Sequence, residues 1–583
     1  MKDLYPLIPY LKKYKKNLFW GFIFVAVSIF LQGMYPLVIG SAIDEISAGS
    51  GKIPYYYYAL LSVGLILLGG IFLFLTRQSL IVVSREIEND LRFDFFSHLQ
   101  ILDKNYFNQK STGDIMAHAT NDINNVRNFL GPGIMYTIQT ILRIIITLII
   151  LFKISYEVTL ISLIPLPVIS FMVYKVMKFT YGRSLKVQEA FSRMTTKAQE
   201  NFSGIRVIKS YVRETYEIEQ FNNISEDYQK KNLSLARIQA YSFPIMFLLT
   251  GFSIILVIYF GGLKVINGSL TIGNVAEFMV YLGQLTWPMI AFGWVINLVQ
   301  RAAPSMQRLM KIINTEPGIY DNKNIIVDVK PEDVKGEIEF VNVSFKYPGT
   351  DNYILKDINI KIPAGNTLGV IGHTGIGKST LINLIPRIYD VNEGEILIDG
   401  INIKKIPLTV LRKSVGVVPQ ESFLFSDTLE KNITYSSDDI NREEAVNAAK
   451  IGGLYKDVIL FPDKFDTIIG ERGITLSGGQ KQRTSIARAV YLKPKILILD
   501  DSLSAVDTNT EEEILRELKK IMETRTSIII SHRISTIQNA DNIIVLSEGT
   551  IKEEGTHNDL INLGGIYYNI YLKQLLEEEI KEI

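Results

Sequence analysis

The sequence contains no cysteine and almost no net charge, and each absence excludes a class of function. Without cysteine, this chain of 583 residues has no disulfide, no thiolate nucleophile and no thiolate metal site, which is compatible with a large cytosolic part. Its 61 basic and 60 acidic residues nearly cancel, so no overall field attracts nucleic acid or an acidic partner. We therefore expect neither a redox function nor a nucleic-acid partner.

Charged residues are also scarce in long runs of the N-terminal part, whereas the C-terminal part has mixed charge and glycine-rich turns. Six apolar stretches are long enough to cross a hydrocarbon core about 30 Å thick, which takes roughly 20 helical residues. The first stretch is too long for a signal peptide and lacks a small-residue cleavage site. We therefore predict a six-helix transmembrane domain with spans at 17–40, 56–76, 131–152, 158–177, 242–263 and 275–298.

Basic residues predict how these spans are oriented. The segment before the first span and the two long connections, residues 77–131 and 178–241, are rich in lysine and arginine. The three remaining connections carry about one lysine each, Lys52, Lys153 and Lys264. Because basic residues accumulate on the cytoplasmic side, we expect the N-terminus, the long loops and the C-terminal part to lie in the cytoplasm of a cell-membrane protein.

Proline and glycine are missing from residues 77 to 105. The second span is therefore predicted to continue as a helix about 40 Å beyond the membrane, at 1.5 Å per residue. At the turns of the two long loops, residues 111–131 and 201–214 are read as short amphipathic elements flanked by polar turns. On pattern alone, ordinary solvated loops remain an alternative for these elements.

Several polar residues interrupt the predicted spans and are costly if they face lipid. We expect them to face the interior of the helix bundle or a wet cavity; they are Gln139, Arg143, Glu277, Gln284 and Asn297. The same cavity could be lined by Met34, Tyr35, Trp287 and Trp294. Aromatic residues in membrane helices are more often packing or interfacial residues, so both readings stay open.

The C-terminal part contains a phosphate-loop pattern, GxxxxGKS, at Gly372–Ser379. It follows an apolar run at 367–371 and precedes an amphipathic helix that is predicted to begin near Lys378. The glycines let backbone N–H groups surround phosphates, and the helix N-terminus adds a favourable dipole. We expect Lys378 to reach the β- and γ-phosphates of a nucleotide, and Ser379 to hold Mg²⁺. The nucleotide-binding residues are predicted to be Gly372, His373, Thr374, Gly375, Ile376, Gly377, Lys378, Ser379 and Thr380.

A second stretch, ILILDDSLSAVD at 496–507, ends a buried strand in two consecutive carboxylates. A strand-ending aspartate beside a phosphate loop is where an NTPase coordinates its metal, so Asp500 is expected to hold Mg²⁺. The next residue, Asp501, is the candidate general base that accepts a proton from the attacking water.

Three further stretches carry a resemblance to a family: LSGGQKQR at Leu476–Arg483, VPQESFLF around Gln420, and IIISHR around His532. With these residues the chain resembles the ATP-binding cassette (ABC) transporter family over essentially its whole length. The resemblance implies an α/β P-loop NTPase domain after the transmembrane domain. It also implies roles for single residues: Tyr347 stacks on adenine, Gln420 touches metal and water, and His532 senses the γ-phosphate.

The resemblance further implies how two chains share nucleotide. The signature residues close over ATP held by the phosphate loop of a second subunit, and residues 504 to 507 form a loop across the interface. Residues 467–473 match a segment that couples to the membrane domain in exporters. The nucleotide-contacting members of these sets are Leu476, Ser477, Gly478, Gly479, Gln480 and Asp507.

The order of the parts resembles a half-size type I exporter. We predict a transmembrane domain at 1–315, a linker at 316–335 and a nucleotide-binding domain at 336–583, with coupling helices near 112–118 and 202–208. The expected function is ATP-driven export of amphipathic or hydrophobic small molecules by alternating access, in contact with membrane lipid. A lipid or glycolipid flippase is the alternative, because it would use the same ATP-driven machinery.

One residue departs from the family pattern. The family usually has glutamate at position 501, whereas this chain has the shorter Asp501, which retracts the carboxylate by roughly an ångström and can cost on the order of a hundredfold in rate. Asp501 is therefore expected to work slowly. Either the chain forms a competent homodimer, or it is the degenerate half of a heterodimer, as in bacterial two-gene multidrug exporters. The intact signature favours the heterodimer; a regulatory subunit that binds ATP but barely hydrolyses it is a further alternative.

Overall fold

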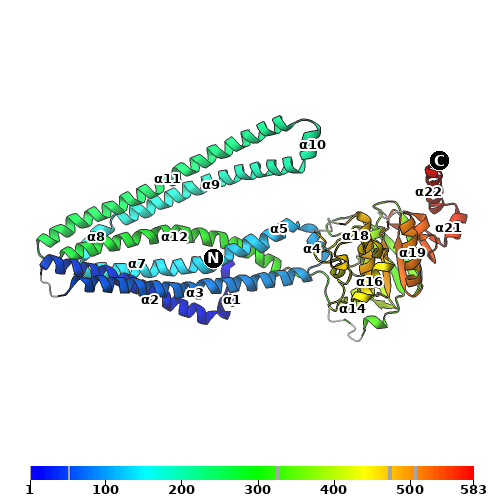
Figure 1. Cartoon of the computed structure of the whole chain (residues 1–583), viewed down its shortest axis with the longest axis horizontal. Coiled ribbons are helices and arrows are strands. Elements are labelled where there is room, and N and C mark those ends of the chain that lie inside the picture. The colour runs from blue at the N-terminus through cyan, green and yellow to red at the C-terminus, as the bar shows by residue number, and fades with distance from the viewer. Residues whose placement is uncertain are drawn as a thin grey trace. The chain divides into compact units, whose positions relative to one another are not determined.

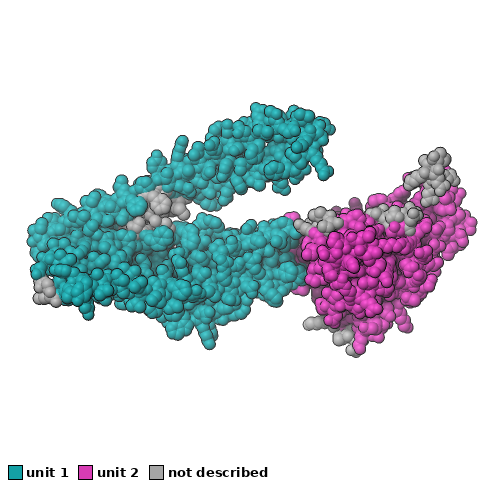
Figure 2. All heavy atoms as spheres, in the orientation of Figure 1, with its two compact units in different colours: residues 1–100, 112–315 teal, residues 101–111, 316–583 magenta. Residues whose placement is uncertain are grey.

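The computed structural model describes residues 2–49, 53–321, 325, 329–470, 476–503 and 508–582. The chain forms two compact units, coloured separately in Figure 2. Unit 1 contains residues 1–100 and 112–315, and unit 2 contains residues 101–111 and 316–583. The predicted transmembrane domain, 1–315, includes the short segment 101–111. In the structure this segment packs with unit 2 instead.

Unit 1 is built of helices (Figure 1). They are η1 Lys2–Leu7, α1 Ile8–Lys13, α2 Lys15–Ala48, α3 Tyr55–Ile101, α5 Thr112–Ala117, η2 His118–Asp122, α6 Ile123–Asn128, η3 Phe129–Gly133, α7 Ile134–Ile154, α8 Tyr156–Leu163, α9 Pro165–Ser203, α10 Ile205–Ser210, α11 Glu214–Ile266 and α12 Ile272–Ile313.

Five of the six predicted spans fall entirely within helical residues of this unit. Among the described residues, three stretches are long and apolar enough to cross a membrane, 15–48, 55–101 and 112–154, and Thr250–Ile266 is a shorter apolar helix. The predicted span 158–177 is divided, because α8 ends at Leu163 and α9 begins at Pro165. Proline suits the start of a helix because its missing N–H would have no intrahelical partner there.

The extension of the second span is confirmed, since α3 runs without a break to Ile101. Helices α9 and α11 lie side by side, and the short helix α10 joins their ends (Figure 1). The first loop differs from its predicted form: residues 112–154 are helical throughout, so no polar turn separates 112–118 from α7. The short separate helix there is α4, Lys104–Gln109, which belongs to unit 2.

Helices α2 and α12 approach each other closely through small residues. A Cβ added at Gly40 would lie 2.0 Å from Oε1 of Glu277, so only glycine leaves room for this buried carboxyl group. The Tyr281 hydroxyl donates to the Gly33 carbonyl oxygen at 2.6 Å. As expected for a costly group, Glu277 is therefore buried inside the unit rather than turned outward.

Unit 2 is an α/β fold with two sheets. Its strands are β1 Ile338–Phe345, β2 Leu355–Ile362, β3 Thr367–Gly372, β4 Glu393–Ile398, β5 Ile401–Asn402, β6 Val415–Val418, β7 Ile496–Asp500, β8 Thr526–Ile530, β9 Asn542–Ser547 and β10 Thr550–Gly555. Its helices are α4, α13 Lys378–Leu384, α14 Leu408–Ser414, α15 Leu429–Ile433, α16 Arg442–Ile451, α17 Tyr455–Val458, α18 Gly478–Tyr491, α19 Thr508–Met522, α20 Ile534–Ile537, α21 His557–Leu563 and α22 Ile566–Glu582.

The larger sheet has the order β10-β9-β3-β8-β7-β6, and the smaller antiparallel sheet has the order β2-β1-β4-β5. In the larger sheet only β10 is antiparallel to its neighbour. Alternate residues of β7 point to opposite faces, which is why Leu497 and Leu499 join one buried cluster and Ile496 and Ile498 the other. With both faces covered, the parallel strands form near-continuous aliphatic runs.

Candidate functional site

Four neighbouring parallel strands of the larger sheet end at the same edge, and each is followed by a predicted site residue. In the order β3, β8, β7 and β6, the strands lead into the phosphate loop, His532, the Asp500–Asp501 pair and Gln420. The register agrees with this, since Ile530 pairs with both Val370 and Asp500. Ligands of such sheets bind at the carboxyl ends of the strands, so this edge is the candidate site.

The phosphate loop joins β3 to α13, as the strand-loop-helix pattern predicts. Gly375 and Gly377 have φ angles of 83° and 105°, a left-handed region that favours glycine. At Gly377 a Cβ would also lie 2.8 Å from Cγ2 of Ile354. The backbone therefore folds tightly before α13, with the first N–H groups of that helix available to an anion.

Lys378 occupies the first position of α13 and is only 7% exposed. Its Nζ donates to the carbonyl oxygens of Gly372 at 2.7 Å and of His373 at 3.0 Å. Burial lowers the pKa of Lys378, while the nearby charges of Asp501 and Asp500 oppose that shift. The ammonium group is thus held inside the loop by neutral oxygens, where a phosphate could replace them.

Asp500 ends β7 and is 6% exposed. Burial raises the pKa of this carboxyl group and Asp501 adds to the rise, whereas a hydrogen bond from Ser379 and the charges of Lys378 and His532 lower it. A buried carboxylate of this kind is stabilised by a cation beside it. Ser379 and Asp500 supply the oxygen ligands that Mg²⁺ prefers, so this pair fits the ion that we expect there.

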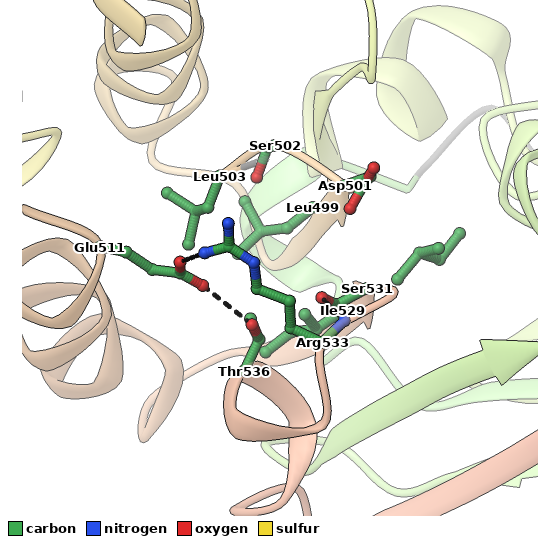
Figure 3. A pocket seen from close by; sticks show the side chains of 10 residues that line it. Leu499, Asp501, Ser502, Leu503, Glu511, Ile529, Ser531, Arg533 and Thr536 are labelled. Atoms are coloured by element: carbon green, nitrogen blue, oxygen red, sulfur yellow. Dashed lines mark hydrogen bonds and ion pairs between the residues drawn. The ribbon is translucent and has the colours of Figure 1, made fainter. Parts of the chain in front are cut away.

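Asp501 follows directly and has a φ angle of 43°, which is uncommon for a residue other than glycine and is best tolerated by aspartate and asparagine. Its backbone N–H donates to the Ile530 carbonyl oxygen at 2.9 Å. Asp501 borders a small pocket of about 20 Å³ whose opposite side holds the ion pair of Arg533 and Glu511 (Figure 3). Thr536 Oγ1 also donates to Glu511, at 3.0 Å.

His532 lies two residues beyond β8, and its backbone is held by a residue that the sequence analysis did not identify. Gln574 of α22 donates from Nε2 to the His532 carbonyl oxygen at 2.6 Å, and its Oε1 accepts from the Ile534 N–H at 2.9 Å. One amide side chain thus bridges the backbone on either side of Arg533. Gln420, which follows β6, is exposed.

Tyr347 lies beside the phosphate-loop helix. Its hydroxyl shares a hydrogen bond of 2.9 Å with Thr380 Oγ1, and its ring meets the Tyr389 ring edge-on at a centroid distance of 5.3 Å. Both tyrosines line a cavity of about 520 Å³ in unit 2. The Tyr389 hydroxyl accepts a hydrogen bond of 3.0 Å from Asn108 of α4, so the segment that interrupts the membrane part of the sequence contacts the wall of this cavity.

The signature segment forms the start of α18. Ser477 caps the helix, with its Oγ accepting from the Gln480 N–H at 3.3 Å and its own N–H donating to Gln480 Oε1 at 3.0 Å. Gln480 Nε2 and Arg483 both donate to Asp457, at 3.1 and 2.7 Å. The hydrogen bonds of these described residues tie the segment to α17 rather than to the phosphate loop.

The remaining signature residues differ in exposure. Leu476 and Gly479 are buried, whereas Gly478 is exposed beside Ser477. Asp507 and residues 504 to 506 lie outside the described residues, as does the end of the 467–473 segment. The expected roles of these residues stay predictions.

The candidate site residues that the sequence predicts carry a spacing pattern, whereas three residues that contact the site through long-range interactions were not predicted. Gln574, Tyr389 and Asn108 have no local signature, because each acts through hydrogen bonds or ring contacts with a distant segment. Only the fold brings them to the site.

Family models match both parts of the chain. The model of the ABC transporter transmembrane region matches residues 18–289, and that of the ABC transporter matches residues 355–504. The solved structure of a bacterial Atm1-family ABC exporter with ATP bound superposes with a TM-score of 0.80 at 26% identity, covering 96% of this chain and 99% of the other.

Curated relatives match along nearly the full length. The chain is 36% identical over 578 residues to the multidrug resistance-like ATP-binding protein MdlA of Buchnera aphidicola, covering 98% of each. It is 36% identical over 554 residues to a probable multidrug resistance ABC transporter ATP-binding/permease protein of Bacillus subtilis, YheI, covering 93% of this chain and 92% of that one. It is 34% identical over 500 residues to an ATP-dependent lipid A-core flippase of Syntrophus aciditrophicus, covering 86% and 82%.

Proposed function

Because this chain belongs to the ABC transporter family, with a helical transmembrane domain followed by an ABC ATPase domain, we propose that it exports amphipathic or hydrophobic small molecules as one half of a dimer. The family membership makes it a multi-pass membrane protein that couples ATP hydrolysis to transport. The observation that carries the proposal is the meeting of the phosphate loop, Asp500 and His532 at one sheet edge of such a chain.

In the proposed hydrolytic cycle, each residue at this edge has one task. Lys378 exchanges its carbonyl partners for the β- and γ-phosphates, and Ser379 and Asp500 hold Mg²⁺. Held by these residues, the ion would neutralise charge that develops on the phosphates. Asp501 accepts the proton of the attacking water, with Gln420 and His532 positioned around the γ-phosphate. Tyr347 lies against the adenine, in the cavity that it shares with Tyr389.

The signature segment is proposed to act on the nucleotide of a second half-transporter. Its helix N-terminus presents N–H groups and the positive end of a dipole, which suits an anion. Its hydrogen bonds within the chain lead to Asp457, away from its own phosphate loop, which is consistent with a use between subunits. Two subunits then enclose two ATP molecules. ATP favours the closed pair and hydrolysis releases it, so the membrane cavity alternates between the two sides.

Coupling is proposed to run through the segments at 112–118 and 202–208. Helix α10 covers most of the second segment. Immediately before the first segment, Asn108 of α4 donates a hydrogen bond to Tyr389 of unit 2. The residues that lead into α5 are therefore anchored to the nucleotide-binding part of the chain.

The export proposal is tested with the purified full-length assembly in liposomes, with an ATP-regenerating system supplied in the outside solution. We expect ATP-dependent accumulation of amphipathic fluorescent dyes, lost in Lys378→Ala. ATP hydrolysis that moves neither dye nor lipid would contradict the proposal. Movement of a labelled lipid but of no dye would favour the flippase alternative, the function that the name of the Syntrophus aciditrophicus relative gives to that protein.

The short carboxylate at 501 supports a heterodimer in which this chain provides the slow site and its intact signature completes the efficient one. The Asp501→Glu variant discriminates the alternatives. If base geometry limits the rate, the isolated chain gains ATPase activity by about ten- to a hundredfold. An unchanged rate would instead implicate a missing partner, whose co-purification would then restore hydrolysis. A homodimer that is already fast with Asp501 would remove the reason for a heterodimer.

A further inference from the structure

Unit 1 contains a cavity of about 330 Å³ between α2, α3, α7 and α12. Its lining includes two arginines, Arg77 and Arg143, and three glutamines, Gln32, Gln139 and Gln284. Tyr136 and Trp287 add aromatic surface. This combination of cations, amides and aromatic rings is far more polar than packing between membrane helices requires.

The Arg143 side chain is oriented by a relay of neutral groups. It donates to Gln32 Oε1 at 2.6 Å, Gln32 Nε2 donates to Ser28 Oγ at 3.1 Å, and Ser28 Oγ donates to the Gly69 carbonyl oxygen at 2.7 Å. Ser28 is only 1% exposed, so the end of the relay is fixed inside the helix pair α2 and α3. The relay positions the guanidinium group without neutralising its charge.

The charges of the cavity are of one sign. Its described lining holds two guanidinium groups and no carboxylate. Placing an uncompensated cation in a membrane segment costs several kcal/mol unless an anion or water accompanies it, and such groups usually mark a ligand path. Arginine also binds carboxylate and phosphate groups through two parallel hydrogen bonds. The cavity therefore favours an anion and disfavours a cationic ligand.

We propose that this cavity binds an amphipath whose anionic head, a carboxylate or a phosphate, is held by Arg77 and Arg143 and whose apolar body lies against Trp287 and Tyr136. The inference rests on the proposed export function, and it names the charge of the substrate class. A purely structural role for Arg143, bonding Gln32 and nothing else, is the alternative that the test must exclude.

The test uses the fluorescence of Trp287 in the full-length assembly, in nanodiscs of phosphatidylcholine. The chain has three tryptophans, so Trp20→Phe and Trp294→Phe leave Trp287 as its only reporter. The quencher is 9,10-dibromostearate, and its methyl ester is the uncharged match. We expect saturable quenching by the anion at a concentration about a hundredfold below that for the ester, because each of the two arginines adds charge-assisted hydrogen bonds worth about tenfold.

Substitutions assign the effect to the arginines. Arg143→Gln and Arg77→Gln should each raise the half-saturating concentration of the anion about tenfold and leave that of the ester unchanged. Arg143→Lys should retain part of the preference for the anion over the ester. Arg77 is exposed, so Arg77→Gln still tests the proposal if Arg143→Gln folds poorly. Arg193→Gln is the matched control, because this exposed arginine of α9 pairs with Asp227. Equal quenching by anion and ester, or no effect of either cavity variant, would overturn the proposal.

Two additional arms identify the source of the anion and separate this inference from the export proposal. If phosphatidylglycerol in the nanodisc displaces dibromostearate, the ligand is a membrane lipid; if it does not, the ligand is a separate amphipath, and both results support an anion site. Should ATP-driven dye transport persist while quenching shows no charge preference, only the present inference fails. Should transport be absent while quenching still depends on the arginines, only the export proposal fails.

Discussion

Each unit holds a cation against neutral hydrogen-bond acceptors, and the difference between the surroundings of the two cations indicates which ligand each site accepts. In unit 2, Lys378 donates to two backbone carbonyl oxygens, with Asp500 and Asp501 close enough to affect its pKa. In unit 1, Arg143 donates to the Gln32 amide, and the lining of its cavity holds no described carboxylate. A site for nucleotide with a metal needs both signs of charge, whereas a site for a simple anion needs only the positive one.

The largest effect is expected at Lys378, the buried cation of unit 2. Lys378→Ala removes a preorganised donor to the phosphates, so we expect the ATPase rate to fall by a factor of about a hundred or more, measured as phosphate release. Lys413→Ala, at an exposed lysine of α14, is the control. A rate within a few fold of the unchanged protein would show that the loop does not hold the triphosphate as proposed.

A second prediction concerns Asp500, a carboxylate of the proposed nucleotide site. Because burial raises the pKa of Asp500, its ionised form destabilises the nucleotide-free fold. This cost is fully present above the pKa of Asp500 in the folded protein and absent well below 3.8, the ordinary pKa of aspartate. Asp500→Asn should therefore raise the free energy of unfolding of nucleotide-free protein by about 1 kcal/mol at pH 7.5, or about 2–4 °C in Tm, with a smaller gain at lower pH.

The same variant should lose Mg²⁺-dependent hydrolysis about a hundredfold, because an amide is a poor ligand for the ion. Thermal unfolding in detergent with EDTA and the ATPase rate with Mg²⁺ are the two measurements. A less stable protein at pH 7.5 would contradict the assignment of Asp500 as a carboxylate that folding disfavours and metal binding requires.

A third prediction concerns Gln574, which is far along the chain from His532 but contacts its backbone. It tests whether Gln574 positions His532, the proposed sensor of the γ-phosphate. Gln574→Leu keeps the bulk of the side chain and removes both bonds to the segment around His532. We expect kcat for ATP to fall about tenfold with KM changed less than twofold, since positioning residues act on the reacting geometry rather than on nucleotide affinity. Lys573→Ala, next to it and exposed, should have no effect. A change confined to KM would assign Gln574 to binding instead.

The smallest expected effect concerns Asn108. Asn108→Ala removes one hydrogen bond to Tyr389, which is worth about 1 kcal/mol. We expect basal ATPase activity to be retained and its stimulation by transported compounds to fall two- to threefold. Unchanged stimulation would show that the contact between α4 and Tyr389 plays no part in coupling transport to ATP hydrolysis.

What the sequence predicted, and what it did not, follows from the distance over which each pattern acts. The run without proline or glycine correctly predicted that α3 continues to Ile101, and the spacing from Gly372 to Ser379 correctly predicted strand, loop and helix. Apolar length likewise located all the long helices of unit 1. These features depend on residues that are near one another in the chain.

The rest required the fold. The packing of residues 101–111 with unit 2 depends on Tyr389 and Gly318, which are remote in sequence, and the helical course of 112–154 replaced a turn that polar residues suggested. The cavity of unit 1 brings together residues from four helices, so the sequence singled out Arg143 without showing its relation to Arg77. No spacing rule encodes such contacts.

The claim that nucleotide in unit 2 controls access to the cavity of unit 1 is tested most directly by labelling a single cysteine. The chain has no cysteine of its own, so Gln284→Cys places one thiol in the cavity lining. In inside-out vesicles we predict rapid reaction with a membrane-impermeant maleimide without nucleotide, and at least tenfold slower reaction with ATP, Mg²⁺ and vanadate, a protection that Lys378→Ala abolishes. The same labelling rate with and without nucleotide would contradict the account.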